Sequence, residues 1–298
     1  MTIPRCIINT LHRLAGTLFL VSLCVLANDK AAAETPANDS DHSAVVLTLG
    51  VATNFRLTLQ TLIEQFLERY AAGRQPELRI SAASSGALYA HISNGAPIDI
   101  FFSADHDRPK KLVTAGLADT RSLQPYATGQ LLLAAGKRGC GSTAPPCNFD
   151  NAGHALVELA NWIEQCDRIA LANPLLAPYG QAANHLLEQL LGNEAELPDT
   201  VIGQNVMQAH QFLATGHVSA ALLSTAQSKT VKTASCAIPI HYYPAIIQSR
   251  VTVIDSTRSR AEQSTIDAFY TFLASNDAVQ TITNSGYLPP PAAEMPTL

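Results

Sequence analysis

Residues 45–51 read VVLTLGV and lead into the polar pair Thr53-Asn54, and this stretch carries the clearest evidence for the fold class. The apolar run predicts a buried strand, and Phe55–Tyr70 after it carries apolar side chains at helical spacing. The same order returns at Leu78–Ala83, which ends at Ser84-Ser85-Gly86 before a second helix-like run. Alternating strands and helices predict an α/β fold with parallel strands, whose polar turns meet beyond the carboxyl ends of the strands.

These turns have a chemistry of their own because each precedes a helix N-terminus, where backbone N–H groups are unpaired and the partial charge is positive. Small hydroxyl and amide side chains there either cap the helix or present donors to an anion. Pro178-Tyr179-Gly180 and Asn205-Val206 form two further turns of this kind. Two turns from each half of the chain, facing one another across a cleft, would bind an oxyanion through neutral donors. Ordinary helix capping is the better explanation of any one turn taken alone, and only the four turns together favour a site.

The alternation continues along the chain, and the remaining elements are predicted from apolar runs and capping residues. Further strands are expected at Ile98–Ser103, Leu131–Ala135, Arg168–Ala172, Thr200–Gly203, Val218–Leu223 and Val251–Ile254. Further helices are expected at Ala87–Ser93, from an Asp107 N-cap to Gly116, and at His154–Gln165, Gln181–Leu191, Val206–Ala214 and Ala261–Ser275.

The N-terminal residues predict export. A basic segment precedes the apolar run Leu14–Leu26, which is too short to span a bilayer, and small residues favour cleavage after Ala33. We therefore expect a signal peptide over residues 1–33, a disordered linker over 34–44 and a periplasmic location. Cleavage after Val25-Leu26-Ala27 is the alternative, and Cys24 leaves a lipoprotein as a less favoured interpretation.

Charge and length narrow the class of protein further. The net charge is −5, charged residues make up 14% of the chain, and no basic block is present, which argues against a nucleic-acid partner. A mildly acidic chain that binds an anion must use local dipoles. Without its signal the chain has about 265 residues, which exceeds one mean domain and favours two lobes.

Four of the six cysteines, namely Cys140, Cys147, Cys166 and Cys236, follow the predicted signal peptide. An oxidising periplasm could pair them in three ways. One pairing joins Cys140 to Cys147 in a small loop and leaves Cys166–Cys236 as the second bridge, and buried free thiols are the alternative. No cysteine pair has C-x-x-C spacing and no histidine stands at ligand spacing beside one, so we expect no direct metal ligands.

A secreted Ser-dependent hydrolase is the competing class of protein. Ser85 next to Gly86 would be the nucleophile, but no G-x-S-x-G elbow is present. The nine histidines form no H-E-x-x-H or H-x-H pattern. Asp99 and Asp105 are interpreted as solvated or capping residues. We therefore expect no catalytic residues and no enzymatic activity.

Several blocks of the chain resemble the periplasmic substrate-binding proteins of molybdate ABC transporters, over nearly all of residues 45–290. The matching blocks are Ala52–Phe55, Ala83–Ala90, Asn94–Asp105, Tyr126–Gly129, Ile169–Pro174, Ala177–Gly180, Gln204–Val206, Gln208–His210 and Tyr243–Ile246. In that family, side-chain and backbone donors at these turns hold the oxyanion. The resemblance implies that Thr53, Asn54, Ser85 and the backbone N–H groups of Tyr179 and Val206 bind the anion.

Some members of the family add a tyrosine hydroxyl at a position that falls near Leu223-Ser224 in this chain. Because a tyrosine is missing there, a role for Ser224 and the preference for molybdate or tungstate stay open. The resemblance implies molybdate or tungstate as ligand, no cofactor, an ABC permease membrane subunit as partner, and a monomer. A binding protein for another oxyanion such as sulfate, or a sensor without a permease, is the alternative.

The resemblance also implies a type II periplasmic binding protein fold of two lobes, each a mainly parallel sheet flanked by helices. Lobe I would combine residues 45–127 with 243–298, and lobe II would cover 128–242. Two crossing strands, near Tyr126–Gly129 and Ile240–Pro244, would form the hinge. Closure of the lobes would exclude water from the anion.

Overall fold

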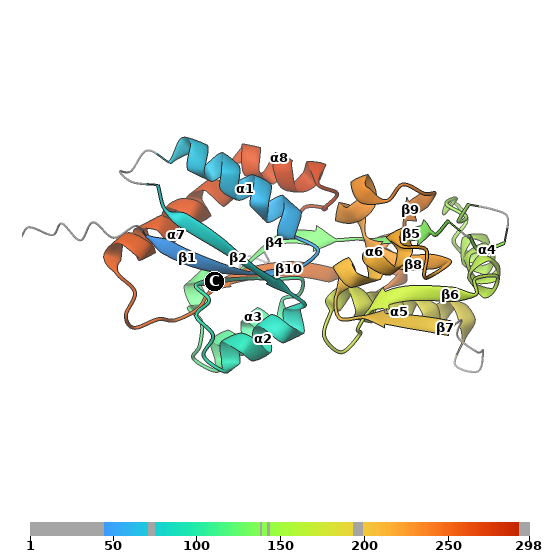
Figure 1. Ribbon diagram of the computed structural model, residues 1–298, viewed down its shortest axis with the longest axis horizontal. Coiled ribbons are helices and arrows are strands. Elements are labelled where there is room, and N and C mark those ends of the chain that lie inside the picture. The colour runs from blue at the N-terminus through green and yellow to red at the C-terminus, as the bar shows by residue number, and fades with distance from the viewer. Residues whose placement is uncertain (1–44, 71–74, 138, 142–143, 193–198, 292–298) are drawn as a thin grey trace, which may run out of the picture. The chain divides into compact units, whose positions relative to one another are not determined.

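The computed structural model describes residues 45–70, 75–137, 139–141, 144–192 and 199–291, and the predicted signal peptide and linker lie outside these ranges. The described chain contains two five-stranded sheets, each with flanking helices (Figure 1). The α/β fold class and the two-lobed arrangement predicted from the sequence are therefore confirmed.

The first sheet has the strand order β2-β1-β3-β10-β4. Its strands are β1 (Val46–Ala52), β2 (Glu77–Ala83), β3 (Ile100–Ser103), β4 (Gln124–Gly129) and β10 (Ile246–Thr252). Only β10 in this sheet is antiparallel to its neighbours, β3 and β4. Its helices are α1 (Arg56–Arg69), α2 (Ser85–Ser93), α3 (Asp107–Thr114), α7 (Arg260–Leu273) and α8 (Asn276–Asn284), with a short 3-10 helix η1 (Thr120–Ser122).

The second sheet has the order β7-β6-β8-β5-β9. Its strands are β5 (Leu131–Ala135), β6 (Arg168–Ala172), β7 (Asp199–Gly203), β8 (Ala220–Ser224) and β9 (Ser235–Ala237). Its helices are α4 (Ala152–Glu164), α5 (Pro178–Leu191) and α6 (Val206–Ala214), with 3-10 helices η2 (Thr225–Thr230) and η3 (Ile240–Tyr242). Here β5 is the antiparallel strand, so both sheets are mainly parallel as expected.

Alternation along β1 explains how the first sheet is held between two helical layers. Leu47, Leu49 and Val51 lie in the core formed with α1, α7 and α8, and the opposite face packs on α2 and α3 (Figure 1). Leu88 from α2 and Leu112 from α3 belong to the core of that second face. Because both faces are covered, the central strands β1 and β3 are mostly apolar.

Several boundaries differ from the prediction. Helix α5 begins at Pro178 rather than at Gln181, because proline is well suited to the first position of a helix. Helix α8 and strand β9 were not predicted. Asp107 lies inside the first turn of α3 and is not its N-cap, whereas Asp105 Oδ1 accepts the N–H of Arg108 at 2.9 Å.

The second crossing strand was also wrongly placed. Residues Ile240–Tyr242 form a 3-10 helix, and the strand that returns to the first sheet is β10, which begins at Ile246. Tyr243, which precedes it, donates its hydroxyl to the carbonyl of Ile238 at 3.1 Å and accepts the N–H of Leu131 at 2.9 Å. Strands β1–β4 and β10 share one sheet and β5–β9 the other, while the exact limits of the lobes stay a prediction.

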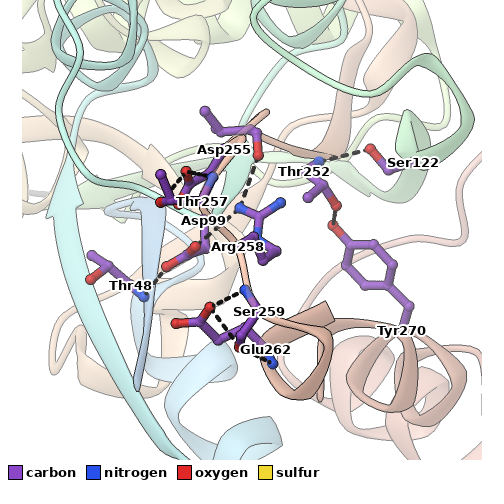
Figure 2. Close-up of polar contacts among 11 residues, drawn as sticks. Thr48, Asp99, Ser122, Thr252, Asp255, Thr257, Arg258, Ser259, Glu262 and Tyr270 are labelled. Atoms are coloured by element: carbon purple, nitrogen blue, oxygen red, sulfur yellow. Dashed lines mark hydrogen bonds and ion pairs between the residues drawn. The ribbon is translucent and has the colours of Figure 1, made fainter. Parts of the chain in front are cut away.

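The segment between β10 and α7 is fastened to the first sheet by Arg258 (Figure 2). Its Nη2 donates to Asp99 Oδ1 at 3.0 Å and to the carbonyl of Val253 at 2.9 Å. Asp99 Oδ2 accepts the N–H of Thr48 at 2.8 Å. Asp99 is therefore a structural ion-pair partner instead of a solvated residue, and Asp105 caps α3 as suggested.

The disulfides follow another of the three possible pairings than the one described from the sequence. Cys140 bonds to Cys166 and Cys147 bonds to Cys236, with Cα–Cα distances of 4.2 and 5.7 Å. Cys140 follows β5 and Cys166 follows α4, while Cys236 lies on β9, which pairs with β5. The pairing follows the tertiary contacts of these elements, which spacing along the chain does not reveal.

Candidate anion-binding site

The four polar turns predicted from the sequence meet around one small cavity. Its lining consists of Ala52, Thr53, Asn54, Ser84, Ser85, Ala104, Ala177, Pro178, Tyr179, Asn205 and Val206. All five predicted site residues are in this lining, and each is at most 8% exposed. The lining includes no charged side chain. The structure therefore brings the predicted residues together, while their role in binding stays a prediction.

Strand register explains why the turns meet in pairs. In the first sheet, Ala52 is paired with Ala83 in parallel register, and the N–H of Thr53 donates to the carbonyl of Ala83 at 3.1 Å. In the second sheet, Ala172 is paired with Gly203, and the N–H of Asn173 donates to the Gly203 carbonyl at 2.7 Å. Each pair of parallel strands thus ends level and delivers two turns side by side.

At the helices around the cavity, side-chain caps satisfy some N–H groups of the first turn and leave others without a partner in the helix. Ser84 accepts the N–H of Ala87 at 3.4 Å in α2. Asn205 Oδ1 accepts the N–H groups of Met207 and Gln208 at 3.0 and 3.1 Å in α6. The first residues of these helices, Ser85 and Val206, keep N–H groups that have no partner within the helix.

Helix α5 also begins with an N–H group that has no partner within the helix, although it has no side-chain cap. Its first residue is Pro178, which has no N–H, and Ala177 before it provides no side-chain cap. The first backbone donor of the helix is therefore Tyr179. Three helices consequently direct an N–H group and the positive end of a dipole towards the cavity.

Ser85 is placed to donate its hydroxyl proton. Its Oγ accepts the N–H of Ala104 at 2.9 Å, and the residue is 1% exposed. A hydroxyl has one proton and two lone pairs, so the bond from Ala104 leaves the proton for another acceptor.

Asn54 belongs to a buried network that the sequence did not predict. Its Nδ2 donates to Gln248 Oε1 at 2.8 Å and to Tyr287 Oη at 3.2 Å. Tyr287 returns its own proton to the carbonyl of Asn54 at 2.7 Å. Both amide protons of Asn54 are therefore engaged behind the turn, and they fix the backbone of the cavity wall.

Gln248 connects this network to the second sheet. Its Nε2 donates to Tyr179 Oη at 3.2 Å, and Tyr126 donates its hydroxyl to Gln248 Oε1 at 3.1 Å. Burial raises the pKa of the Tyr126, Tyr179 and Tyr287 phenols above its usual value, so all three stay protonated at neutral pH. A glutamine in the otherwise largely apolar run before Arg250 is the only sequence signal that pointed to this network.

Ser224 lies next to the cavity rather than in its lining. It is fully buried, its Oγ accepts the N–H of Ala226 at 3.3 Å, and its N–H donates to Gln227 Oε1 at 3.1 Å. These contacts make it the N-cap of η2.

Two negative findings hold for the described ranges. No group of three or more His, Cys, Asp or Glu side chains converges there in a way that could hold a metal ion. In the same ranges, none of the helices is long and apolar enough to cross a membrane.

Two sheet-based lobes with a buried polar cavity where their helices begin define a class of protein, the two-lobed solute-binding proteins. The chain belongs to the family of bacterial extracellular solute-binding proteins, which it matches over residues 47–288. It is 32% identical over 205 residues to the molybdate-binding protein ModA of Rhodobacter capsulatus, covering 68% of this chain and 74% of that protein.

Two comparisons with Azotobacter vinelandii agree. The chain is 29% identical over 248 residues to the molybdate-binding protein ModA of that organism, covering 82% of this chain and 90% of that protein. The solved structure of the A. vinelandii periplasmic molybdate-binding protein superposes with a TM-score of 0.64 at 32% identity, covering 82% of this chain and 99% of that one.

Proposed function

We propose that this chain is the extracytoplasmic binding protein of a molybdate ABC transporter, which captures the oxyanion between its lobes and delivers it to a permease. The observation that carries the proposal is the set of turns around the cavity, where donors are neutral and come from both lobes. The similarity to molybdate-binding proteins of two bacteria supports the choice of ligand.

The proposed donors suit a tetrahedral dianion. Thr53 and Ser85 offer hydroxyl groups, and Tyr179 and Val206 offer backbone N–H groups. Neutral, fixed donors satisfy the oxygens of the anion without burying a lysine or arginine, whose desolvation is costly. The metal of the oxyanion then has no direct protein ligand.

For Asn54 we propose a donor different from the one that its side chain first suggests. Because both Nδ2 protons are engaged with Gln248 and Tyr287, the backbone N–H at this turn is the group that we assign to the anion. The side chain would hold that backbone in place.

Selectivity would follow from the size of the cavity. A rigid ring of donors that fits long metal–oxygen bonds leaves a smaller anion such as sulfate with stretched or missing hydrogen bonds. Tungstate has the same shape and charge as molybdate, and we propose that it binds as well.

The remaining parts of the proposal concern the setting. We propose a periplasmic location after removal of a signal peptide, an ABC permease membrane subunit as partner, a monomeric state, and no enzymatic activity or cofactor. The periplasm also suits the two disulfides.

Isothermal titration calorimetry of the protein with molybdate, tungstate, sulfate and phosphate tests the proposal. One-to-one binding of the first two, with at least a hundredfold weaker binding of the others, is the expected result. Preferred binding of sulfate would replace the ligand but keep the class, and no binding of any of the four would overturn the proposal.

A further inference from the structure

We infer that Gln248 is a positioning residue that latches the two halves of the anion site together through the hydroxyl of Tyr179. The inference rests on the proposed function and goes beyond it, because neither side chain is assigned to the anion: Tyr179 is assigned there only through its backbone N–H. The latch would set how slowly the bound oxyanion is released.

The first step is the position of Gln248. It lies on β10 in the first sheet, and it is fully buried at a point where the pairing of β10 with β4 shifts register. Its Oε1 accepts from Asn54 Nδ2 at 2.8 Å and from Tyr126 Oη at 3.1 Å, and both of these residues also belong to the first lobe. The carbonyl end of the amide is thus anchored on one side of the cleft.

The other end of the amide faces the second lobe. Gln248 Nε2 donates to Tyr179 Oη at 3.2 Å, and Tyr179 is in the first turn of α5, packed in the core of the second sheet. One side chain therefore contacts Asn54 and Tyr179, which are proposed anion-binding residues from opposite lobes.

The Tyr179 hydroxyl has little freedom to move away while the lobes are closed. A Cβ added to Gly129, at the end of β4, would collide with the Tyr179 hydroxyl and would lie 3.0 Å from Gln248 Nε2. The phenol therefore packs directly against the strand that leads from the first lobe to the second. Glycine at this position leaves room for the hydrogen bond between Gln248 and Tyr179.

A bond between two lobes exists only when the lobes are closed. Separation of the lobes would break the bond from Gln248 to Tyr179 but would leave the bonds from Asn54 and Tyr126 intact, since those lie within the first lobe. A hydrogen bond between neutral groups changes an equilibrium constant by about two- to tenfold. Because the bond forms after the anion has entered, its loss should raise the rate of release and leave the rate of association unchanged.

Tyr179→Phe is the direct test, because it removes the hydroxyl and keeps the backbone N–H. Tyr126→Phe is the matched control, because it removes a hydroxyl that bonds the same Gln248 from within the first lobe. Release of radiolabelled molybdate is measured after dilution into excess unlabelled molybdate, and association is measured by rapid mixing. We expect Tyr179→Phe to speed release about three- to tenfold with association within twofold of wild type, and Tyr126→Phe to change neither rate by more than about twofold.

Gln248→Met provides a second variant of similar volume if Tyr179→Phe does not fold. It removes the bond to Tyr179 together with those from Asn54 and Tyr126, so it should speed release at least as much as Tyr179→Phe. Adding Tyr179→Phe to Gln248→Met should change release no further, because the bond between the two side chains is already gone. Equal release from Tyr179→Phe and wild type, or equal acceleration in Tyr126→Phe, would overturn the latch while the proposed function stands. Wild-type protein that binds no molybdate would overturn the proposed function and the latch with it.

Discussion

The backbone N–H of Gly86 donates to the carbonyl oxygen of Leu176 at 2.8 Å. Gly86 is in the first turn of α2, and Leu176 is in the turn between β6 and α5, so this bond joins two of the four turns that line the cavity across the two lobes. Arg108 adds a second bond beside it, since its Nη2 donates to the carbonyl of Leu175 at 3.1 Å. The rim of the cavity is thus closed by backbone contacts as well as by side chains.

Gly86→Ala should weaken anion binding about tenfold or more, because an added Cβ overpacks the closed state, in which Gly86 contacts Leu176. A Cβ at this position would lie 2.9 Å from the Leu176 oxygen and 3.0 Å from its Cα, and both are backbone atoms that cannot turn aside. Titration calorimetry with molybdate measures the effect. Gly153→Ala in α4, where a Cβ meets only Asn151 Oδ1 at 3.9 Å, is the control and should leave the affinity unchanged. Equal affinities for Gly86→Ala and wild type would show that closure does not bring these backbones together.

Ser85→Ala should weaken molybdate binding by about 1–3 kcal/mol, because a hydrogen bond to a charged oxygen is lost. The Ser85 hydroxyl accepts the N–H of Ala104 at 2.9 Å, so its own proton is free to be donated to the anion. The substitution removes this donor. Ser275→Ala is a matched control, since Ser275 caps α8 by accepting the N–H of Ala278 at 3.3 Å. That variant should lose about 0.5–2 kcal/mol of stability, measured by urea denaturation, with full affinity. An affinity unchanged by Ser85→Ala would remove this residue from the site.

The parts of the site that depend on residues close together in the sequence could be predicted. Thr53-Asn54 and Ser84-Ser85-Gly86 stand out because a strand-like run ends there and a helix begins, and such a signal lies within a few neighbouring residues. The predicted first residue of α5, Gln181, was too late in the chain, because Pro178 suits both a turn and the first position of a helix.

The supporting network could not be predicted for a physical reason. Asn54 and Gln248 are 194 residues apart, and nothing near either residue indicates the other. Their contact arises only when β10 enters the sheet as its antiparallel strand. The disulfide pairing was left open for the same reason, because β9 places Cys236 beside a distant loop.

The stability of the protein should fall in acid partly because of His210. Burial lowers the pKa of this histidine below its usual value of 6.5, and its Nε2 lies 3.2 Å from Thr230 Oγ1. Below about pH 6.5 the unfolded chain binds the proton more readily than the folded one, so the free energy of unfolding decreases as the pH falls. His210→Gln should show a weaker decrease between pH 7.5 and 5.5, values chosen to span roughly one unit either side of 6.5. The test is urea denaturation of both proteins at the two pH values. A decrease of the same size in both would contradict this contribution.

The two disulfides should differ in what they contribute to stability. Cys147–Cys236 closes a loop with a sequence separation of 89, and Cys140–Cys166 closes one of 26. In the chain-entropy account, the longer loop stabilises by about 4.6 kcal/mol and the shorter by about 3.5 kcal/mol. Replacing Cys147 and Cys236 by serine should therefore lower the free energy of unfolding by about 1 kcal/mol more than replacing Cys140 and Cys166. Peptide mapping under non-reducing conditions supplies the control, because it should recover these two pairs. Recovery of Cys140 linked to Cys147 would contradict both the pairing and the predicted order, since the short loop between those residues would then carry one bridge.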